Sequence, residues 1–218
     1  MNELKYQYKY PRPSVTTDCV IFGMHPTDGL FVLLIQRGNE PYKGCWAFPG
    51  GFLEMTEDAE TGARRELYEE TGLRVPSLKQ LGAFTQVDRD PRDRVISIAY
   101  YGLVTISDVC GGDDAAEAKW FPINELPSLA FDHRQIFDQA IKTLREQLSY
   151  APVGIDVLKA PFTAHELVSL YQCILGKPLN GETLLTQLTT AGILFSAKEM
   201  NKNYPEDEPT FRFNQNLI

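Results

Sequence analysis

The sequence predicts an α+β protein in which helices cover a mixed β-sheet, followed by a small winged-helix domain. Three observations predict this class. Alternating apolar segments typical of strands dominate the first part, amphipathic helices lie between them, and the pattern becomes mainly helical after residue 150. The composition, 43% hydrophobic and 23% charged over 218 residues, is typical of a globular chain and excludes disorder.

The first part alternates strands with two helices. A turn at His25–Gly29 separates the first two apolar segments and is typical of a hairpin. Helical spacing of apolar residues predicts helices over Asp58–Thr71 and Phe131–Leu148. We expect strands, the last of which runs into a turn, over Val15–Met24, Leu30–Gly38, Leu81–Asp88, Val95–Ile106 and Lys119–Pro127.

A change of pattern at Ser149–Gly154 places a domain boundary near residue 150, giving domains of residues 1–150 and 151–218. Thr163, three residues before Glu166, forms a capping-box pattern, and Gly176 is typical of the residue that ends the helix so begun. A second short helix extends to Ala191, and two short strands then flank a polar loop. Helix, turn, helix and hairpin make a winged-helix layout.

Several classes of protein are excluded. No apolar run reaches the roughly 20 residues of a membrane span, and the first residues lack the apolar stretch of a secretory signal. The formal net charge of −8 disfavours a nonspecific nucleic-acid coat. The cysteines are too scattered for a disulfide framework or a zinc site, so we expect a cytoplasmic protein; they are Cys19, Cys45, Cys110 and Cys173.

The segment Gly51–Leu73 carries the chemistry. Thr56 is a good N-cap, and Glu57 with Asp58 puts acid in the first helical turn, where the helix dipole favours it. Farther along the helix, three carboxylates fall within an arc of about 100°. They repel one another unless a cation neutralises them, and oxygen-only ligands suit Mg²⁺ or Mn²⁺; the three are Glu66, Glu69 and Glu70.

A plain solvent-exposed helix is the alternative interpretation of this segment. Arg65 and Glu69 would then form an ordinary surface ion pair. The preceding Pro49–Glu54 favours the metal site, because two adjacent glycines let the backbone approach a ligand closely.

The same segment resembles the Nudix box, G-x5-E-x7-R-E-U-x-E-E-x-G-U, where U is aliphatic. Every specified position agrees, from Gly51 and Glu57 through Arg65 to Gly72 and Leu73. The resemblance implies a Nudix (MutT-like) hydrolase with an α/β/α sandwich, which cleaves a nucleoside diphosphate linked to another group by attack of water on phosphorus.

The resemblance also implies roles for single residues. The metal ligands would be Glu66, Glu69, Glu70 and the Gly50 carbonyl, while Glu57 and Arg65 would orient the loop and the carboxylates. Gly51 would lie against substrate. One more carboxylate beyond the box often assists in this family, and the sequence leaves open which of three supplies it: Asp113, Asp114 or Glu117.

Substrate recognition is expected from a second segment. Leu81–Val104 resembles ADP-ribose pyrophosphatases and also the Nudix-related regulators that bind ADP-ribose or similar ligands. Arg89, Arg92 and Arg94 within it suit a diphosphate; equally, they suit a salt-bridged loop with Asp88, Asp90 and Asp93. Three aromatic residues are placed in the core rather than against a purine: Trp46, Phe48 and Phe84.

Two features favour an enzyme over a regulator. The box is intact, whereas the regulators commonly carry a degraded one. Residues 151–218 contain five basic and seven acidic residues, and 180–191 contains no Lys or Arg, so DNA binding through the winged helix ranks second. Base edges would be within reach only of uncharged side chains, chiefly Thr183, Thr186 and Gln187. A homodimer is expected from the resemblance alone.

Two further expectations concern isolated residues. His133 and His165 lack partners at metal-ligand spacing and are expected at the surface or in caps. Cys45, beside Trp46, is expected to be buried.

Overall fold

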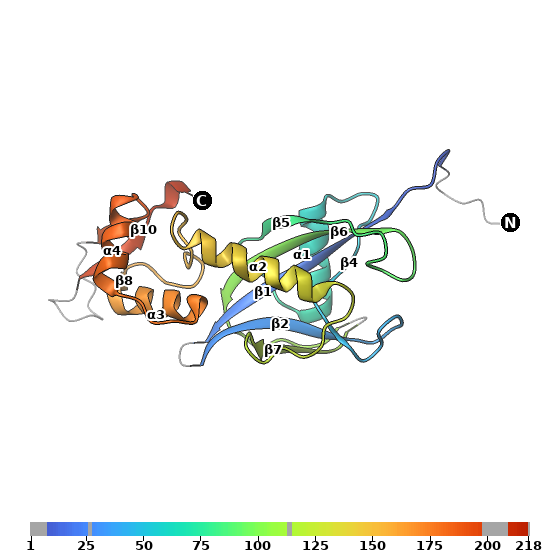
Figure 1. Ribbon diagram of the computed structural model, residues 1–218, viewed down its shortest axis with the longest axis horizontal. Coiled ribbons are helices and arrows are strands. Elements are labelled where there is room, and N and C mark those ends of the chain that lie inside the picture. Colours follow the sequence, from blue (N-terminus) through green and yellow to red (C-terminus); the bar gives the residue numbers. More distant parts are fainter. Residues whose placement is uncertain (1–7, 26–27, 113–114, 198–208, 218) are drawn as a thin grey trace.

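The computed structural model describes residues 8–25, 28–112, 115–197 and 209–217. Its centre is a seven-stranded mixed sheet (Figure 1). β1 (Ser14–His25) and β6 (Val95–Thr105) run parallel, and every other described pairing in the sheet is antiparallel. The remaining strands are β2 (Gly29–Arg37), β3 (Trp46–Ala47), β4 (Gly50–Phe52), β5 (Lys79–Phe84) and β7 (Ala115–Pro122).

Two helices cover opposite faces of this sheet, α1 (Ala59–Thr71) and α2 (His133–Gln147). The alternation along β1 explains why. Val20 and Phe22 belong to the buried cluster that contains α2, and Cys19 and Ile21 belong to the one that contains α1. A strand buried on both faces lacks a polar side, as its apolar run indicates. The predicted sandwich is confirmed.

Three local expectations were wrong. β5 ends at Phe84 rather than at residue 88, because residues 85–94 form a loop tied together by side-chain hydrogen bonds. The N-cap of α1 is Asp58, not Thr56, and its carboxylate accepts from the Thr61 N–H at 2.8 Å. Part of the expected glycine loop is strand β4, which pairs with β1.

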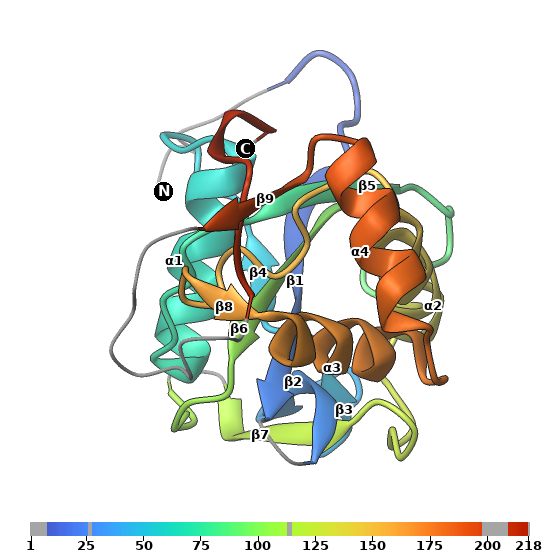
Figure 2. The same cartoon turned by 90° about the vertical axis from the view of Figure 1, so that its left-hand side faces the viewer.

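The C-terminal unit contains a second, three-stranded sheet beside two helices (Figure 2). The capping box of α3 is present, with Thr163 and Glu166 bonded reciprocally, and Gly176 ends that helix in the left-handed conformation. The elements are β8 (Phe162–Thr163), α3 (Ala164–Leu175), α4 (Gly181–Thr190), β9 (Leu194–Ala197), β10 (Thr210–Phe213) and a 3-10 turn (Gln215–Leu217).

This unit packs against the end of α2. Leu144 and Leu148 share one buried cluster with Leu170 and Ile174, and the Arg145 Nε donates to the Ile174 carbonyl at 2.9 Å. Residues 148–161, between α2 and β8, form no helix or strand. The domain boundary predicted near residue 150 lies in this segment and stays a prediction.

Two expectations about single residues were also wrong. His133 is buried, because it opens α2 beneath the sheet, and Cys45 is exposed, because the chain turns there before β3. In the part of the chain that is described, no helix is long and apolar enough to cross a membrane.

Candidate active site

Helix α1 presents its carboxylates to the sheet edge because its apolar side is fixed. Ala63 and Leu67 are buried against β1, and Gly72 ends the helix with φ 70°, its N–H donating to the Tyr68 carbonyl. Ala59 packs against the same cluster, as its spacing predicts. The helix face next to this strip carries Glu66, Glu69 and Glu70.

The two glycines let α1 approach the chain at β4. The Gly50 N–H donates to Glu70 Oε2 at 2.8 Å. A Cβ at Gly50 would lie 2.0 Å from the Thr17 carbonyl oxygen, and one at Gly51 would lie 2.4 Å from Glu66 Oε1. A side chain at Gly50 would therefore run into the backbone of β1, and one at Gly51 would displace the Glu66 carboxylate.

Arg65 ties the acidic side chains together. Its guanidinium bonds both oxygens of Glu57, at 2.6 and 3.0 Å, and also Glu66 Oε1 at 2.9 Å and Glu69 Oε2 at 3.0 Å. The bond from Arg65 lowers the pKa of Glu57. Burial raises the pKa of Glu66, and Arg65 offsets part of that rise. The helix thus holds an excess of negative charge that one guanidinium balances incompletely.

The donor set suits a hard divalent cation, since every side-chain ligand is a carboxylate oxygen. Thr17 lies opposite Gly51 in the β1–β4 pairing, so its side chain lies on the same face of the sheet as Glu66. The buried Thr17 hydroxyl has no hydrogen-bond partner among the described residues. No three His, Cys, Asp or Glu side chains in the described ranges stand ready-made as a metal cluster. Arg65 and the Gly50 N–H occupy the oxygens that a cation would take.

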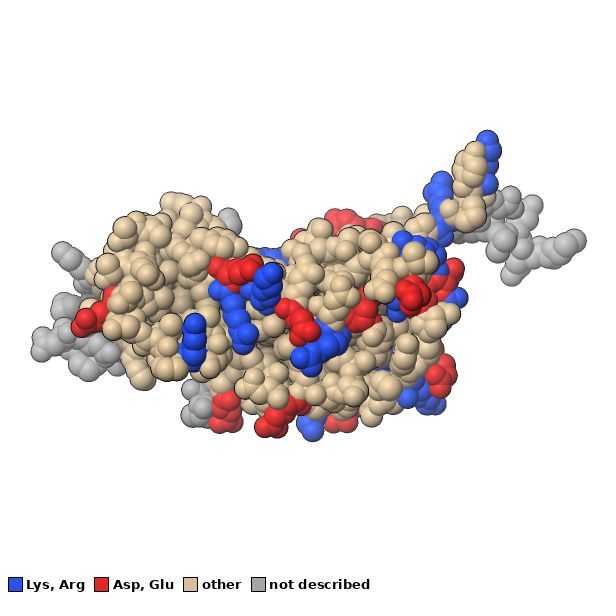
Figure 3. Space-filling model, in the orientation of Figure 1, with Lys and Arg blue, Asp and Glu red and all other residues tan. Residues whose placement is uncertain are grey.

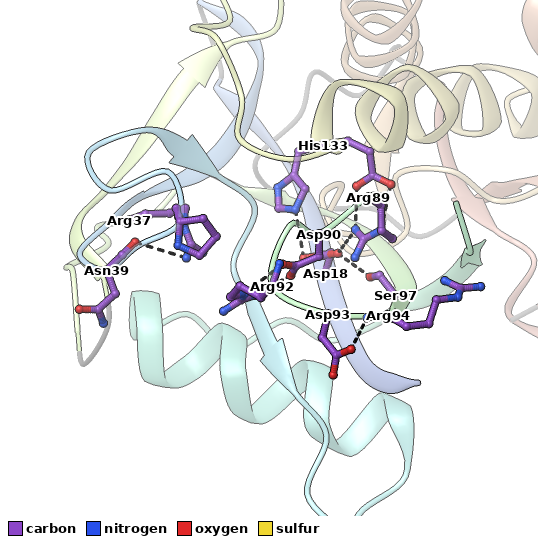
Figure 4. A network of polar contacts seen from close by, with 12 residues as sticks. Asp18, Arg37, Asn39, Arg89, Asp90, Arg92, Asp93, Arg94, Ser97 and His133 are labelled. Carbon is purple, nitrogen blue, oxygen red and sulfur yellow. Dashed lines mark hydrogen bonds and ion pairs between the residues drawn. The ribbon is translucent and has the colours of Figure 1, made fainter. Parts of the chain in front are cut away.

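These carboxylates border a cavity of about 500 Å³, within the range of small-molecule sites. The opposite wall comes from β1, the end of β2, the 85–94 loop and the residues at the start of α2 (Figure 4). Sequence reasoning missed most of this wall, which includes Asp18, Arg37, Phe131 and His133.

A buried polar network forms the floor of the cavity. Arg89 makes a two-pronged contact with Asp132, at 2.7 and 2.9 Å, and lies 3.4 Å from Asp18 Oδ2. Ser97 donates to the same Asp18 oxygen. The Arg89 side chain is only 3% exposed, so its charge is committed to these two carboxylates.

The other two arginines of the loop differ from Arg89. Arg92 is 41% exposed, lines the cavity and holds Asp90 by two contacts, at 2.7 and 3.0 Å. Arg94 donates to the Gln86 and Val95 carbonyls and is not among the residues that line the cavity. Only Arg92 therefore combines an internal ion pair with access to a ligand.

Phe131 lines the cavity and contacts Tyr42, which does not line it. Both residues have positive φ (54° and 63°), and their ring centroids are 4.8 Å apart. Arg37 lies over the Phe131 ring at 4.8 Å, and Arg92 lies over it at 5.8 Å and over Phe52 at 5.3 Å. Strained backbone of this kind clusters at functional sites.

The remaining predicted residues lie elsewhere. Glu117, on β7 opposite Gln36, does not line the cavity, and Asp113 and Asp114 lie outside the described residues. Phe48 and Phe84 are buried, as expected, although Phe48 also borders the cavity; Trp46 is half-buried against Phe121.

On α4, Thr183, Thr186 and Gln187 are exposed, and Leu188 is buried in the core. The Thr186 hydroxyl already donates to the Glu182 carbonyl. Figure 3 shows mixed positive and negative side chains over the face that carries α2, and few charged side chains over the C-terminal unit. This face presents no continuous basic patch.

Helix-borne carboxylates that border a glycine turn and an arginine-containing cavity are typical of proteins that act on phosphate compounds with a divalent cation. The chain belongs to the NUDIX family, whose domain model matches residues 12–140.

Two relatives carry informative names. The ADP-ribose pyrophosphatase of Methanocaldococcus jannaschii is 45% identical over 135 residues, covering 62% of this chain and 76% of that protein. The ADPR responsive transcriptional repressor NtrR of Acinetobacter baylyi is 32% identical over 190 residues, covering 85% of this chain and 76% of that protein.

Three solved structures of one further relative, Shewanella oneidensis NrtR, are similar to this chain, two of them over more than nine-tenths of its length. NrtR alone has a TM-score of 0.74 at 30% identity, covering 93% of this chain and 95% of that one. Its complex with a 27mer DNA has a TM-score of 0.70 at 29% identity, with 92% and 93% covered. Its NUDIX domain with ADP ribose has a TM-score of 0.59 at 33% identity, with 64% and 94% covered.

Proposed function

We propose that this protein is a Nudix pyrophosphohydrolase that cleaves the diphosphate of ADP-ribose or a related nucleotide sugar with a divalent cation. The products are AMP and a sugar phosphate. One observation carries the proposal: the Glu66, Glu69 and Glu70 carboxylates and the Gly50 turn border a cavity of about 500 Å³ that also holds Arg92. The 45% identity to a named ADP-ribose pyrophosphatase supports this substrate class.

The cation in this proposal is Mg²⁺ or Mn²⁺, held by Glu66, Glu69, Glu70 and the Gly50 carbonyl. Such an ion neutralises phosphate oxygens and supplies a bound water that is nucleophilic at neutral pH. Arg65 and Glu57 keep the carboxylates in register, since the guanidinium contacts three of the acidic side chains at 3.0 Å or less.

The substrate is bound by the wall opposite α1. The Arg92 guanidinium faces the cavity while it holds the Asp90 carboxylate by two hydrogen bonds, and it suits a diphosphate oxygen. The Phe131 ring, which lines the cavity, offers a stacking surface for a base. Arg89 supports this wall from below through Asp132, and Arg94 is assigned no contact with substrate.

The test is release of AMP from ADP-ribose, NADH, dinucleoside polyphosphates and nucleotide sugars, each with Mg²⁺ and with Mn²⁺. We expect turnover of ADP-ribose or a nucleotide sugar, abolished by EDTA and reduced by several orders of magnitude in Glu69→Gln or Glu70→Gln. The matched control is Glu60→Gln, on the same helix but paired with Arg64 away from the cavity. Wild-type turnover in both site variants would show that the assigned ligands are wrong.

A nucleotide-responsive repressor that binds DNA through the C-terminal unit is the second candidate. The NtrR relative, which aligns over 85% of this chain, favours it. Under this second proposal the protein is a homodimer, and residues 151–218 form a winged-helix domain. Three side chains of α4 then face the bases: Thr183, Thr186 and Gln187. The scarcity of basic residues in that part argues for weak binding. Absence of a mobility shift with palindromic genomic fragments at low salt would remove this candidate.

A further inference from the structure

His133 is a buried histidine that borders the cavity and is assigned no role in the proposed hydrolysis. It is 3% exposed and stacks on the Phe48 ring, with centroids 5.3 Å apart and an interplanar angle of 15°. Its Nδ1 accepts a hydrogen bond from the Phe48 N–H at 2.9 Å, and its Nε2 lies 3.4 Å from Asp18 Oδ1.

These contacts define the state of the ring. Because Nδ1 accepts, the proton of the neutral imidazole is on Nε2, which faces Asp18. Burial lowers the pKa of His133 and so favours this neutral form, although Asp18 and Asp132 act in the opposite direction. Asp18 is itself held by Ser97 and Arg89, which fixes the carboxylate that orients the ring (Figure 4).

The Phe48 N–H belongs to the turn that leads to Gly50. Three successive residues of this turn are bonded to three different elements. Phe48 donates to His133, the Pro49 carbonyl accepts from the Cys19 N–H at 2.8 Å, and Gly50 donates to Glu70 at 2.8 Å. Of these three bonds, the one from Phe48 is made to a side chain of α2, His133, which lies on the opposite face of the sheet from α1.

We propose that His133 is a positioning residue that sets the turn at Phe48–Gly51 and thereby the affinity of the Gly50–Glu70 site for a divalent cation. This inference rests on the proposed function, because it takes Gly50 and Glu70 as cation ligands. Groups that hold ligands in place from outside commonly change metal affinity by about 10–100-fold when they are replaced.

Two replacements of His133 separate its two ring nitrogens. His133→Asn keeps an acceptor near the position of Nδ1, and His133→Gln moves its polar group toward the position of Nε2 and leaves the Phe48 N–H without its acceptor. The experiment titrates the full-length protein with Mn²⁺ alone and follows free Mn²⁺ by electron paramagnetic resonance. We expect affinity to fall about 10–100-fold in His133→Gln and to be largely retained in His133→Asn.

The matched control is Thr163→Ala. It removes a buried hydroxyl that caps α3 in the C-terminal unit and leaves the contact between His133 and Phe48 intact. We expect lower thermal stability but wild-type Mn²⁺ affinity. In the hydrolysis assay, His133→Gln is expected to lower kcat at limiting Mn²⁺ and to recover it at saturating Mn²⁺, whereas a loss caused by a smaller folded fraction would lower kcat at both.

Each outcome decides the matter. A folded His133→Gln protein with wild-type Mn²⁺ affinity overturns the proposal, as does an equal loss in Thr163→Ala. If His133→Gln does not fold, Asp18→Asn replaces it, because the ring then loses the carboxylate that orients it, and unchanged affinity there is equally contradictory. Wild-type protein that binds no Mn²⁺ overturns the proposed function itself, which separates that failure from a failure confined to His133.

Discussion

The Gly50 N–H donates to Glu70 Oε2 at 2.8 Å, joining the first residue of β4 to the last turn of α1. At the same place the virtual Cβ of Gly51 falls within the Glu66 carboxylate. Turn and helix therefore form one rigid unit, in which the backbone of the turn fixes the acidic side chains. The predictions below test this unit and the wall opposite it.

Gly51→Ala is expected to displace the Glu66 carboxylate. The added methyl lies 2.4 Å from Glu66 Oε1, so the end of this flexible side chain must move, at a cost of about 1 kcal/mol in the free energy of unfolding. Urea denaturation measures that cost, and AMP release measures the expected loss of turnover.

Gly192→Ala is the control for that experiment. Gly192 has a positive φ of 69°, which strains an alanine, but nothing lies within 4 Å of its virtual Cβ, and it belongs to the C-terminal unit. It should lose stability and keep its turnover. Equal loss of turnover in both variants would mean that crowding of Glu66 is not the cause.

Arg89 and Arg92 are expected to respond differently to replacement by alanine. Arg89→Ala leaves Asp132 and Asp18 without their cation in a buried place, which costs about 3–5 kcal/mol in the free energy of unfolding. Arg92→Ala leaves the buried Asp90 carboxylate with the backbone N–H of residue 92, so it should cost less stability than Arg89→Ala while KM for the nucleotide rises. Thermal melts and steady-state kinetics of both variants check this. A stable Arg89→Ala protein with a raised KM would show that Arg89 contacts the substrate and would contradict its assignment to the buried ion pairs.

Stability is expected to fall as the medium becomes acidic, through His133. Burial lowers its pKa in the folded chain, whereas the unfolded chain has a value of about 6.5. Below that pH the unfolded state binds a proton that the folded state does not, so the free energy of unfolding falls by up to about 1.4 kcal/mol per pH unit until the folded pKa is reached. The charged groups facing the ring are Asp18, Asp132, Arg89 and Arg37.

The measurement is urea denaturation of wild type and His133→Asn between pH 7 and pH 5. The variant should show a flatter dependence, whereas His165→Asn, at an exposed position on α3, should parallel the wild type. Parallel curves for wild type and His133→Asn would contradict the assignment.

The helix α1 could be predicted from the sequence, because its pattern is local. Its apolar residues and its three carboxylates lie at helical spacing within one segment, and Ala63 and Leu67 are buried as that spacing requires, although the cap is Asp58 and not the predicted Thr56. The same holds for the capping box at Thr163 in α3.

The opposite half could not be predicted, because it is assembled by tertiary contacts. Phe48 and His133 are 85 residues apart, and Asp18 and Arg89 are 71 apart. Their meeting depends on the parallel pairing of β1 with β6 and on where α2 begins. An isolated histidine and an arginine beside aspartates carry no local signal for such partners, so His133 was expected at the surface.

The most direct measurement is a crystal structure of the full-length protein with Mn²⁺ and a non-hydrolysable ADP-ribose analogue, with manganese located by anomalous scattering. We predict a manganese peak in contact with Glu66, Glu69, Glu70 and the Gly50 carbonyl, with the diphosphate between that ion and Arg92. Manganese bound elsewhere, with the three carboxylates still held by Arg65 and the Gly50 N–H, would contradict the account.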